Sequence, residues 1–237
     1  MDKKVKVLII IPAYNEADNI ITVTREISLK WPEFDYLVIN DGSVDETSKI
    51  CMENKIHYVD LPINLGIGGA VQTGYRYARE NGYDIAVQID GDGQHDVSFL
   101  GDLVQPLIEG KADIAIGSRF LNKEGFQSTL TRRIGISFLS FLIKICTGLK
   151  IHDVTSGFRA VGRRFIEIYA RYYPADYPEP EAIISAVMNG GKIMELPVVM
   201  RERESGNSSI NRLRSIYYMI KVSLAIIICR ISFGIRR

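Results

Sequence analysis

The sequence predicts an α/β protein built on an open, mostly parallel, doubly wound sheet. Apolar runs of strand length alternate with segments of helical spacing through residues 5–116, a pattern typical of a parallel sheet with helices on both faces. Acidic residues follow three of the predicted strands: Glu16, Asp41, and Asp90 with Asp92. Ligands of such sheets lie over the carboxyl ends of the strands, so these acids indicate a candidate site.

The first two strand–helix units can be located from apolar spacing and loop residues. Residues 5–11 form an apolar run that Pro12 closes, and residues 16–30 place apolar side chains on one helical face. A second strand over 36–39 ends in a tight loop. There Ser43, with Glu46 three residues on, is expected to cap a short helix.

The next elements follow at the same pace. Residues 57–61 predict a short third strand, and residues 66–80 a helix that opens on a glycine-rich loop and stops at Asn81-Gly82. A fourth strand over 84–89 is rich in branched apolar side chains. The remaining expected elements are a helix over 99–108, a strand over 113–116 and a helix over 182–188.

The fourth strand leads into Asp90, Asp92 and Gln94, which stand at every second position with glycines between them. On extended backbone these side chains point to the same side. Close carboxylates repel each other unless a cation lies between them, and oxygen ligands suit Mg²⁺ or Mn²⁺. The stretch therefore predicts a divalent metal site, with a plain Asp-Gly turn as the alternative. His95 is expected to support the loop, because imidazole is not a preferred Mg²⁺ ligand.

Composition places the chain in a reducing compartment and gives it a basic end. The 237 residues carry a net charge of +1, yet residues 201–237 contain eight Lys and Arg against two Glu. The three cysteines show neither pair nor metal spacing, which fits the cytoplasm. The N-terminus passes directly into a strand-like run, so no signal peptide is expected.

Two basic apolar segments indicate contact with a membrane surface. In residues 130–146 the polar side chains form one narrow helical stripe, which predicts a helix lying in the interface, with a core helix as the alternative. Residues 216–229 are apolar but contain Lys221, and a span needs about 20 apolar residues. We expect an interfacial or partner-bound helix there. Nucleic-acid binding is not expected, because exposed stacking aromatics do not accompany the basic residues.

Several short motifs, taken in chain order, resemble the family 2 glycosyltransferases with the GT-A fold. The likeness is greatest to polyprenyl-phosphate sugar transferases of the dolichyl-phosphate-mannose-synthase type. An ordered set is far more specific than any single motif. The motifs are residues 11–16, 40–43, 64–70, 90–94, 116–120, 153–159 and 203–209. The resemblance implies a GT-A catalytic domain over 1–209, including a membrane-interface helix at about 130–148, and a basic apolar membrane-associating helix over 210–237.

The resemblance also implies roles for individual residues. Asp41 would accept a hydrogen bond from the nucleobase, and a divalent cation at Asp90, Asp92 and Gln94 would bridge the diphosphate. Arginines would meet phosphates, although Ser209 stands where relatives often have Lys. The substrate-binding positions are Pro12, Tyr14, Glu16, Asp41, Gly66, Gly68, Gly69, Arg119, Arg133, Arg203 and Ser209.

A general base is needed only if the acceptor is a hydroxyl group, because a lipid phosphate is already anionic. Asp153 matches the position proposed for a base in relatives, with a turn carboxylate as the alternative. Glu181 precedes a predicted helix and is a second candidate. Glu179 is better explained as a first-turn acid that complements the helix dipole.

These features predict an inverting hexosyltransferase on the cytoplasmic face of a membrane, to which it binds peripherally. It would move a hexose or N-acetylhexosamine from a nucleotide sugar, UDP-linked by expectation, to a polyprenyl phosphate for cell-envelope glycan modification. A small integral membrane protein is a further candidate partner. The alternatives are transfer to a hydroxyl of a growing surface polysaccharide and a non-catalytic nucleotide-sugar-binding scaffold subunit.

Overall fold

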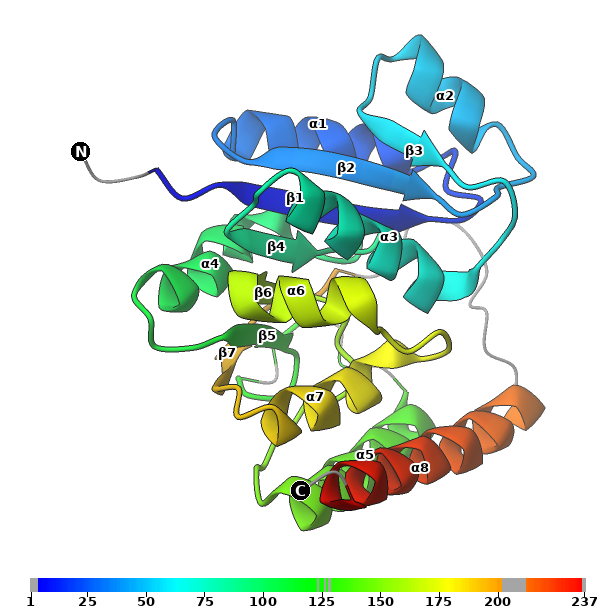
Figure 1. Cartoon of the computed structure of the whole chain (residues 1–237). Coiled ribbons are helices and arrows are strands. Elements are labelled where there is room, and N and C mark those ends of the chain that lie inside the picture. The colour runs from blue at the N-terminus through cyan, green and yellow to red at the C-terminus, as the bar shows by residue number, and fades with distance from the viewer. Residues whose placement is uncertain (1–3, 123, 126, 128, 202–211, 236–237) are drawn as a thin grey trace.

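A seven-stranded sheet in the order β3-β2-β1-β4-β6-β5-β7 organises the molecule (Figure 1). The computed structural model describes residues 4–122, 124–125, 127, 129–201 and 212–235. All strand pairs are parallel except those of β6, which runs antiparallel to β4 and β5. The predicted α/β class with a mostly parallel sheet is confirmed. The strands are β1 (Val7–Ala13), β2 (Asp35–Asn40), β3 (Tyr58–Asp60), β4 (Ile85–Gln88), β5 (Ile114–Ser118), β6 (Arg159–Gly162) and β7 (Ile193–Pro197).

Helices cover both faces of this sheet. Leu8 and Ile10 of β1 join a buried cluster that includes residues of α3, α6 and α7, whereas Ile9 and Ile11 join a second cluster with α1 and α4. Because side chains alternate along a strand, burial on both faces explains the continuous apolar run. The helices are α1 (Ile20–Lys30), α2 (Thr47–Glu53), α3 (Gly66–Glu80), α4 (Leu100–Ile108), α5 (Leu130–Thr147), α6 (Arg163–Arg171), α7 (Pro178–Met188) and α8 (Arg212–Ile235), with a 3₁₀ turn η1 (Val97–Phe99) before α4.

Strand β1 is the point where the strand order reverses. It pairs with β2 on one side and with β4 on the other, so the chain first builds outward through β3 and then returns to β4. The loops after β1 and β4 diverge at such a switch point and leave a crevice where ligands bind. The topology therefore puts the predicted nucleotide and metal motifs at the carboxyl ends of β1, β2 and β4.

Strand β1 continues past the residue that was expected to close it. Ile10 O accepts from Ile89 N, so the even-numbered residues of β1 direct their backbone groups toward β4. The β4 pairing stops at Ile10, whereas the β2 pairing continues to Ala13. Pro12 therefore lacks its N–H on a side where no partner strand is present, and the strand runs through it without losing a hydrogen bond.

The predicted capping box at Ser43 is wrong. Helix α2 begins only at Thr47, and Glu46 precedes it without a capping side chain. Ser43 Oγ instead accepts from Asn15 N at 2.9 Å, which ties the loop after β2 to the loop after β1. Asp45 Oδ1 accepts from Thr47 N at 3.0 Å and satisfies the start of the helix.

Helices α5 and α8 pack together at one end of the molecule, against α7 (Figure 1). Lys221, which interrupts the apolar run of α8, forms an ion pair with Asp176 in the loop before α7. None of the helices in the described ranges has the length and apolarity that crossing a bilayer requires. The expected domain boundary at residue 209 lies outside the described residues.

Candidate active site

The loops after β1, β2 and β4 meet at the switch point. Asp41 N donates to Ala13 O at 2.8 Å, which joins the ends of β2 and β1. A Cβ built on Gly91 would lie 3.2 Å from Pro12 O and 3.5 Å from Glu16 Cγ, so the turn after β4 runs close against the loop after β1. The structure thus brings three of the sequence motifs into one place.

Asp41 is buried beneath this edge, with 3% of its surface exposed. Its Oδ1 accepts from Leu65 N at 2.7 Å and so anchors the segment that leads into α3. Burial raises the pKa of the Asp41 carboxyl, and the backbone N–H groups of Leu65 and Gly66 oppose that rise. Tyr14 remains about half exposed at the end of β1. Asp41 is thus a buried acceptor and Tyr14 an exposed aromatic residue after neighbouring strands, and their contact with a nucleotide stays a prediction.

The glycine-rich loop has packing roles that the sequence did not indicate. Gly68 N donates to Ala175 O at 3.0 Å, and a Cβ on Gly68 would lie only 1.9 Å from Pro174 O. A Cβ on Gly69 would lie 2.5 Å from Leu65 Cβ. Gly68 thus allows α3 to pack against the segment before α7, and Gly69 leaves room for the Leu65 side chain at the start of α3. Gly66, with φ +78°, has a left-handed backbone that favours glycine. Approach of the backbone to a nucleotide stays a prediction.

The turn after β4 is held by its own side chains. Asp92 Oδ1 accepts from Gln94 N at 3.1 Å, and His95 Nδ1 accepts from Asp90 N at 2.9 Å. The His95 ring stacks on Phe158 with ring centroids 4.8 Å apart. Because Nδ1 accepts, the ring carries its proton on Nε2, which lies 3.7 Å from Asp90 Oδ2. This geometry agrees with the expectation that His95 supports the loop.

The residues at this turn fit a divalent cation that shares its coordination with a ligand. The Asp90 side chain is 40% exposed. A Cβ on Gly157 would lie 3.1 Å from Asp90 Oδ1, so only glycine leaves this space beside the carboxylate. No cluster of three or more His, Cys, Asp or Glu suited to a metal occurs within the described ranges. Two carboxylates and the Gln94 amide suffice only if substrate oxygens complete the shell, as they do for Mg²⁺ bound with phosphates.

Arg119, which follows β5, and Asp153 form a buried ion pair on the side of the sheet where β4 also ends, in the turn over residues 90–94 that we call the predicted metal turn. Asp153 is fully buried and Arg119 is 8% exposed. Asp153 Oδ2 accepts from Arg119 Nε and Oδ1 from Arg119 Nη2, both at 2.7 Å, and Oδ2 also accepts from Arg119 N at 3.1 Å. Because both carboxylate oxygens are held by the guanidinium, the geometry argues against Asp153 as a general base.

The two glutamates at the start of α7 face different surroundings. Glu181 accepts from Tyr172 OH at 3.1 Å and lines a small cavity beside Lys221 of α8. Burial raises the pKa of Glu179, with Arg159 opposing that rise and Asp90 adding to it. Asp90 thus contributes to the raised pKa of Glu179, while the role of Glu181 as a base stays a prediction.

The remaining predicted positions are spread more widely. Arg133 is exposed in the first turn of α5. Arg203 and Ser209 lie outside the described residues. The segment before them is fixed, because Arg201 N donates to Gln94 O at 2.9 Å and the Arg201 guanidinium pairs with Glu26 at 2.8 Å. The chain therefore passes directly beside the metal turn as far as Arg201.

Two buried polar side chains that the sequence did not indicate, those of Arg159 and Glu195, hold the backbone of the segment from Asp153 to β6. Arg159 is 1% exposed and donates to Ser156 O and Glu179 O, which ties the loop before β6 to α7. Glu195 accepts hydrogen bonds from the backbone before Asp153. A polar residue inside an otherwise apolar strand is the signal that could have indicated Glu195.

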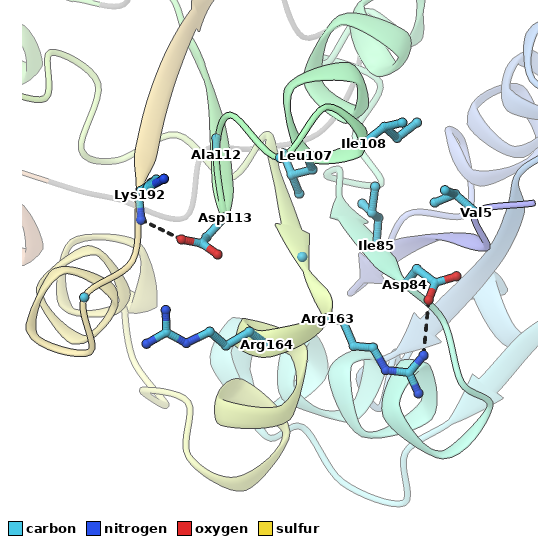
Figure 2. A pocket seen from close by; sticks show the side chains of 13 residues that line it. Val5, Asp84, Ile85, Leu107, Ile108, Ala112, Asp113, Arg163, Arg164 and Lys192 are labelled. Carbon is cyan, nitrogen blue, oxygen red and sulfur yellow. Dashed lines mark hydrogen bonds and ion pairs between the residues drawn. The ribbon is translucent and has the colours of Figure 1, made fainter. Parts of the chain in front are cut away.

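A cavity of about 590 Å³ opens at the opposite end of the strands, where β1, β4, β5 and β7 begin (Figure 2). None of the predicted site residues lines it. Arg163 pairs with Asp84 at 3.1 Å, and Asp113 accepts from the backbone N of Lys192 at 2.8 Å, so both of these carboxylates already have partners within the protein. The carboxyl ends of β1, β2 and β4, at the switch point, are therefore the better candidate for the active site.

Comparison with known proteins gives one family model and several curated relatives. The model described as glycosyl transferase family 2 matches residues 8–169. The chain is 30% identical over 220 residues to the polyprenol monophosphomannose synthase of Mycolicibacterium smegmatis, covering 87% of this chain and 81% of that protein. It is 33% identical over 213 residues to the UDP-N-acetylglucosamine–dolichyl-phosphate N-acetylglucosaminyltransferase of Methanococcus voltae, covering 81% and 84%.

Solved structures of the same fold are also similar. The glucosyl-3-phosphoglycerate synthase of Mycobacterium tuberculosis, in complex with Mn²⁺, UDP and glucosyl-3-phosphoglycerate, matches with a TM-score of 0.72. The match covers 96% of this chain and 80% of that chain at 20% sequence identity. At that identity the likeness supports the fold alone.

Proposed function

The chain belongs to glycosyl transferase family 2, and from this premise we propose that it transfers a hexose or N-acetylhexosamine from a UDP-sugar to a polyprenyl phosphate. Relatives of similar length carry names of polyprenyl-phosphate sugar transferases for mannose and N-acetylglucosamine. The observation that carries the choice of acceptor is the buried Arg119–Asp153 pair. In this pair the Arg119 guanidinium holds both carboxylate oxygens of Asp153, the predicted general base. A lipid phosphate acceptor needs no such base, because its oxygen is already anionic.

The donor would lie over the ends of β1, β2 and β4. In this proposal Asp41 receives the nucleobase, Tyr14 covers the base or ribose, and Asp90, Asp92 and Gln94 hold Mg²⁺ or Mn²⁺ on the diphosphate. A bound divalent ion would neutralise charge on the departing nucleoside diphosphate. The synthase that shares this fold was solved with Mn²⁺ and UDP, which is the kind of ligand pair that this proposal expects here.

The reaction would be a direct displacement with inversion at the anomeric carbon. A bond forms between a phosphate oxygen of the acceptor and that carbon, while the bond from the carbon to the diphosphate oxygen of the donor breaks. No proton has to move. The protein contributes by positioning both phosphates and by placing cationic side chains near them.

The acceptor proposal also depends on contact with the bilayer, because a polyprenyl chain stays in the membrane. Helix α5 exposes one apolar stripe at helical spacing, each member between 49% and 65% exposed: Ile134, Phe138, Phe141 and Ile145. Helix α8 exposes a second stripe: Ile220, Leu224, Ile228 and Ile231. We take these stripes, with their basic neighbours, as the surface that lies on the anionic cytoplasmic leaflet.

The function is tested by transfer of radiolabelled sugar. Purified protein with Mn²⁺ and undecaprenyl phosphate is expected to convert UDP-glucose or UDP-N-acetylglucosamine into lipid-extractable label, and label from GDP-mannose alone would overturn the choice of a UDP donor. Label released only into water would indicate hydrolysis. Tight binding of nucleotide without turnover of any donor would favour a scaffold subunit and refute the proposal.

Membrane binding gives a second prediction. The triple variant Ile134→Ser, Phe138→Ser, Phe141→Ser is expected to bind vesicles of phosphatidylcholine and phosphatidylglycerol on the order of 100-fold more weakly, because each side chain contributes about 1 kcal/mol. Co-sedimentation with vesicles measures this. The control replaces three exposed apolar residues elsewhere, Leu29, Met52 and Ile108, by serine. Equal loss of binding in both variants would refute the assignment of this surface.

A further inference from the structure

We propose that Glu195 of β7 is a positioning residue for the transfer reaction: it fixes the His152–Asp153 backbone and thereby orients Arg119 toward a substrate phosphate. The inference rests on the proposed function and on the sequence-based expectation that Arg119 meets a phosphate. It adds a residue from the edge strand that none of the sequence motifs contains. The phosphate is either the donor diphosphate or the acceptor phosphate, and the test below separates the two.

The hydrogen bonds of the Glu195 side chain all go to one short segment of the described chain, His152–Asp153. Its side chain is 9% exposed. Oε1 accepts from His152 N and Asp153 N, both at 2.9 Å, and Oε2 accepts from His152 N at 2.8 Å and lies 2.9 Å from His152 Nδ1. Consecutive backbone N–H groups that converge on one carboxylate hold that backbone in a single orientation.

The next link is the Arg119–Asp153 pair. Because Asp153 directly follows His152, the Glu195 carboxylate fixes the backbone from which the Asp153 side chain projects. Asp153 then binds Arg119 at its Nε, its Nη2 and its backbone N. Thr155 Oγ1 accepts from the same Nη2 at 3.1 Å. The plane of the guanidinium is therefore set by groups that Glu195 holds in place.

The sheet supplies the rigidity that such a link needs. Glu195 lies opposite Ile116 in the parallel β5–β7 pair, and Arg119 follows the last residue of β5. Glu195 thus lies in β7, and Arg119 directly follows the adjoining strand β5 of the same sheet. A shift of about 1 Å at a reacting group can cost up to about 100-fold in rate, so a fixed frame matters for catalysis.

The chemistry of the carboxylate makes a sharp test possible. Glu195→Gln preserves shape but replaces one acceptor oxygen by an amide that donates, and that amide faces backbone N–H groups. Glu195→Asp keeps two acceptor oxygens on a shorter side chain. The matched control is Glu167→Gln, the same chemical change on α6 away from this segment. All three are compared with wild type for transfer from its best donor to undecaprenyl phosphate.

Glu195→Gln is expected to raise one KM about 10- to 100-fold, with the melting temperature close to that of the control. A rise in the acceptor KM assigns Arg119 to the lipid phosphate, and a rise in the donor KM assigns it to the diphosphate. Glu195→Asp is expected to recover part of the loss. In an Arg119→Ala background, Glu195→Gln should add no further change in KM, because both act through the same side chain.

A lower melting temperature with both KM values unchanged would overturn the proposal and leave Glu195 a purely structural residue. Additive effects of Arg119→Ala and Glu195→Gln on KM would overturn it as well. Absence of transfer by wild type would instead be a failure of the proposed function. The two failures are therefore distinguishable.

Discussion

Replacing Asp92 by alanine is expected to lower metal-dependent sugar transfer at least about 100-fold, because it removes a carboxylate from the proposed cation site. The fold should persist. Asp92 lies on a turn at the surface edge of the sheet, and loss of its hydrogen bond to Gln94 N costs only about 1 kcal/mol. Transfer rates across a Mn²⁺ titration, with Mn²⁺ binding followed by electron paramagnetic resonance, measure the effect.

Asp102→Ala provides the control for charge removal. Asp102 is exposed in the first turn of α4 and is not one of the predicted metal ligands, so this variant should transfer sugar at the wild-type rate. If Asp92→Ala retained wild-type activity and Mn²⁺ affinity, the metal site would have to be placed elsewhere.

Replacing Asp153 by alanine is expected to reduce the free energy of unfolding by about 3–5 kcal/mol, because it leaves the Arg119 guanidinium buried without its partner. The 2.7 Å contact and the near-complete burial of both side chains make this an ion pair whose disruption strongly destabilises the folded state. Urea unfolding followed by circular dichroism measures the change. The double variant Arg119→Met, Asp153→Leu should recover much of the loss, since it removes both charges.

The surface pair Asp84–Arg163 is the matched comparison. Its N–O distance is 3.1 Å, but the Arg163 side chain is 53% exposed. Removing Arg163 should therefore cost no more than about 1 kcal/mol. Equal, small losses for the two pairs would mean that burial does not strengthen the effect of losing Asp153, and would weaken the account of Arg119 as a fixed guanidinium.

Local sequence determined the elements whose signal is continuous along the chain. Helix α3 ends where Asn81-Gly82 predict, and it already begins at Gly66, so the expected glycine-rich loop forms its first turns. Strands β1, β2 and β4 follow from branched apolar runs, and the boundaries differ by one to two residues. The metal turn was recognisable because its polar residues alternate at the end of a buried strand. These signals depend only on neighbours within a few residues.

The antiparallel strand β6 was not predicted, for a physical reason. Arg159–Gly162 is four residues long and contains an arginine, so its own composition does not favour a strand. It becomes one because it fits between β4 and β5, where Arg159 lies opposite both Gln88 and Ile116. Partners that are distant in the chain supply its hydrogen bonds.

The sequence by itself determined the fold class, the order of the motifs and their position at the carboxyl ends of the strands. The tertiary structure alone decided how the site is held. Asp153 pairs with a residue 34 positions away, and Glu195 reaches back 43 positions to His152. At Gly68 the backbone of Pro174 and Ala175 leaves no room for a Cβ atom. A side chain's role depends on the groups that burial brings within hydrogen-bond distance, and spacing along the chain does not encode those contacts.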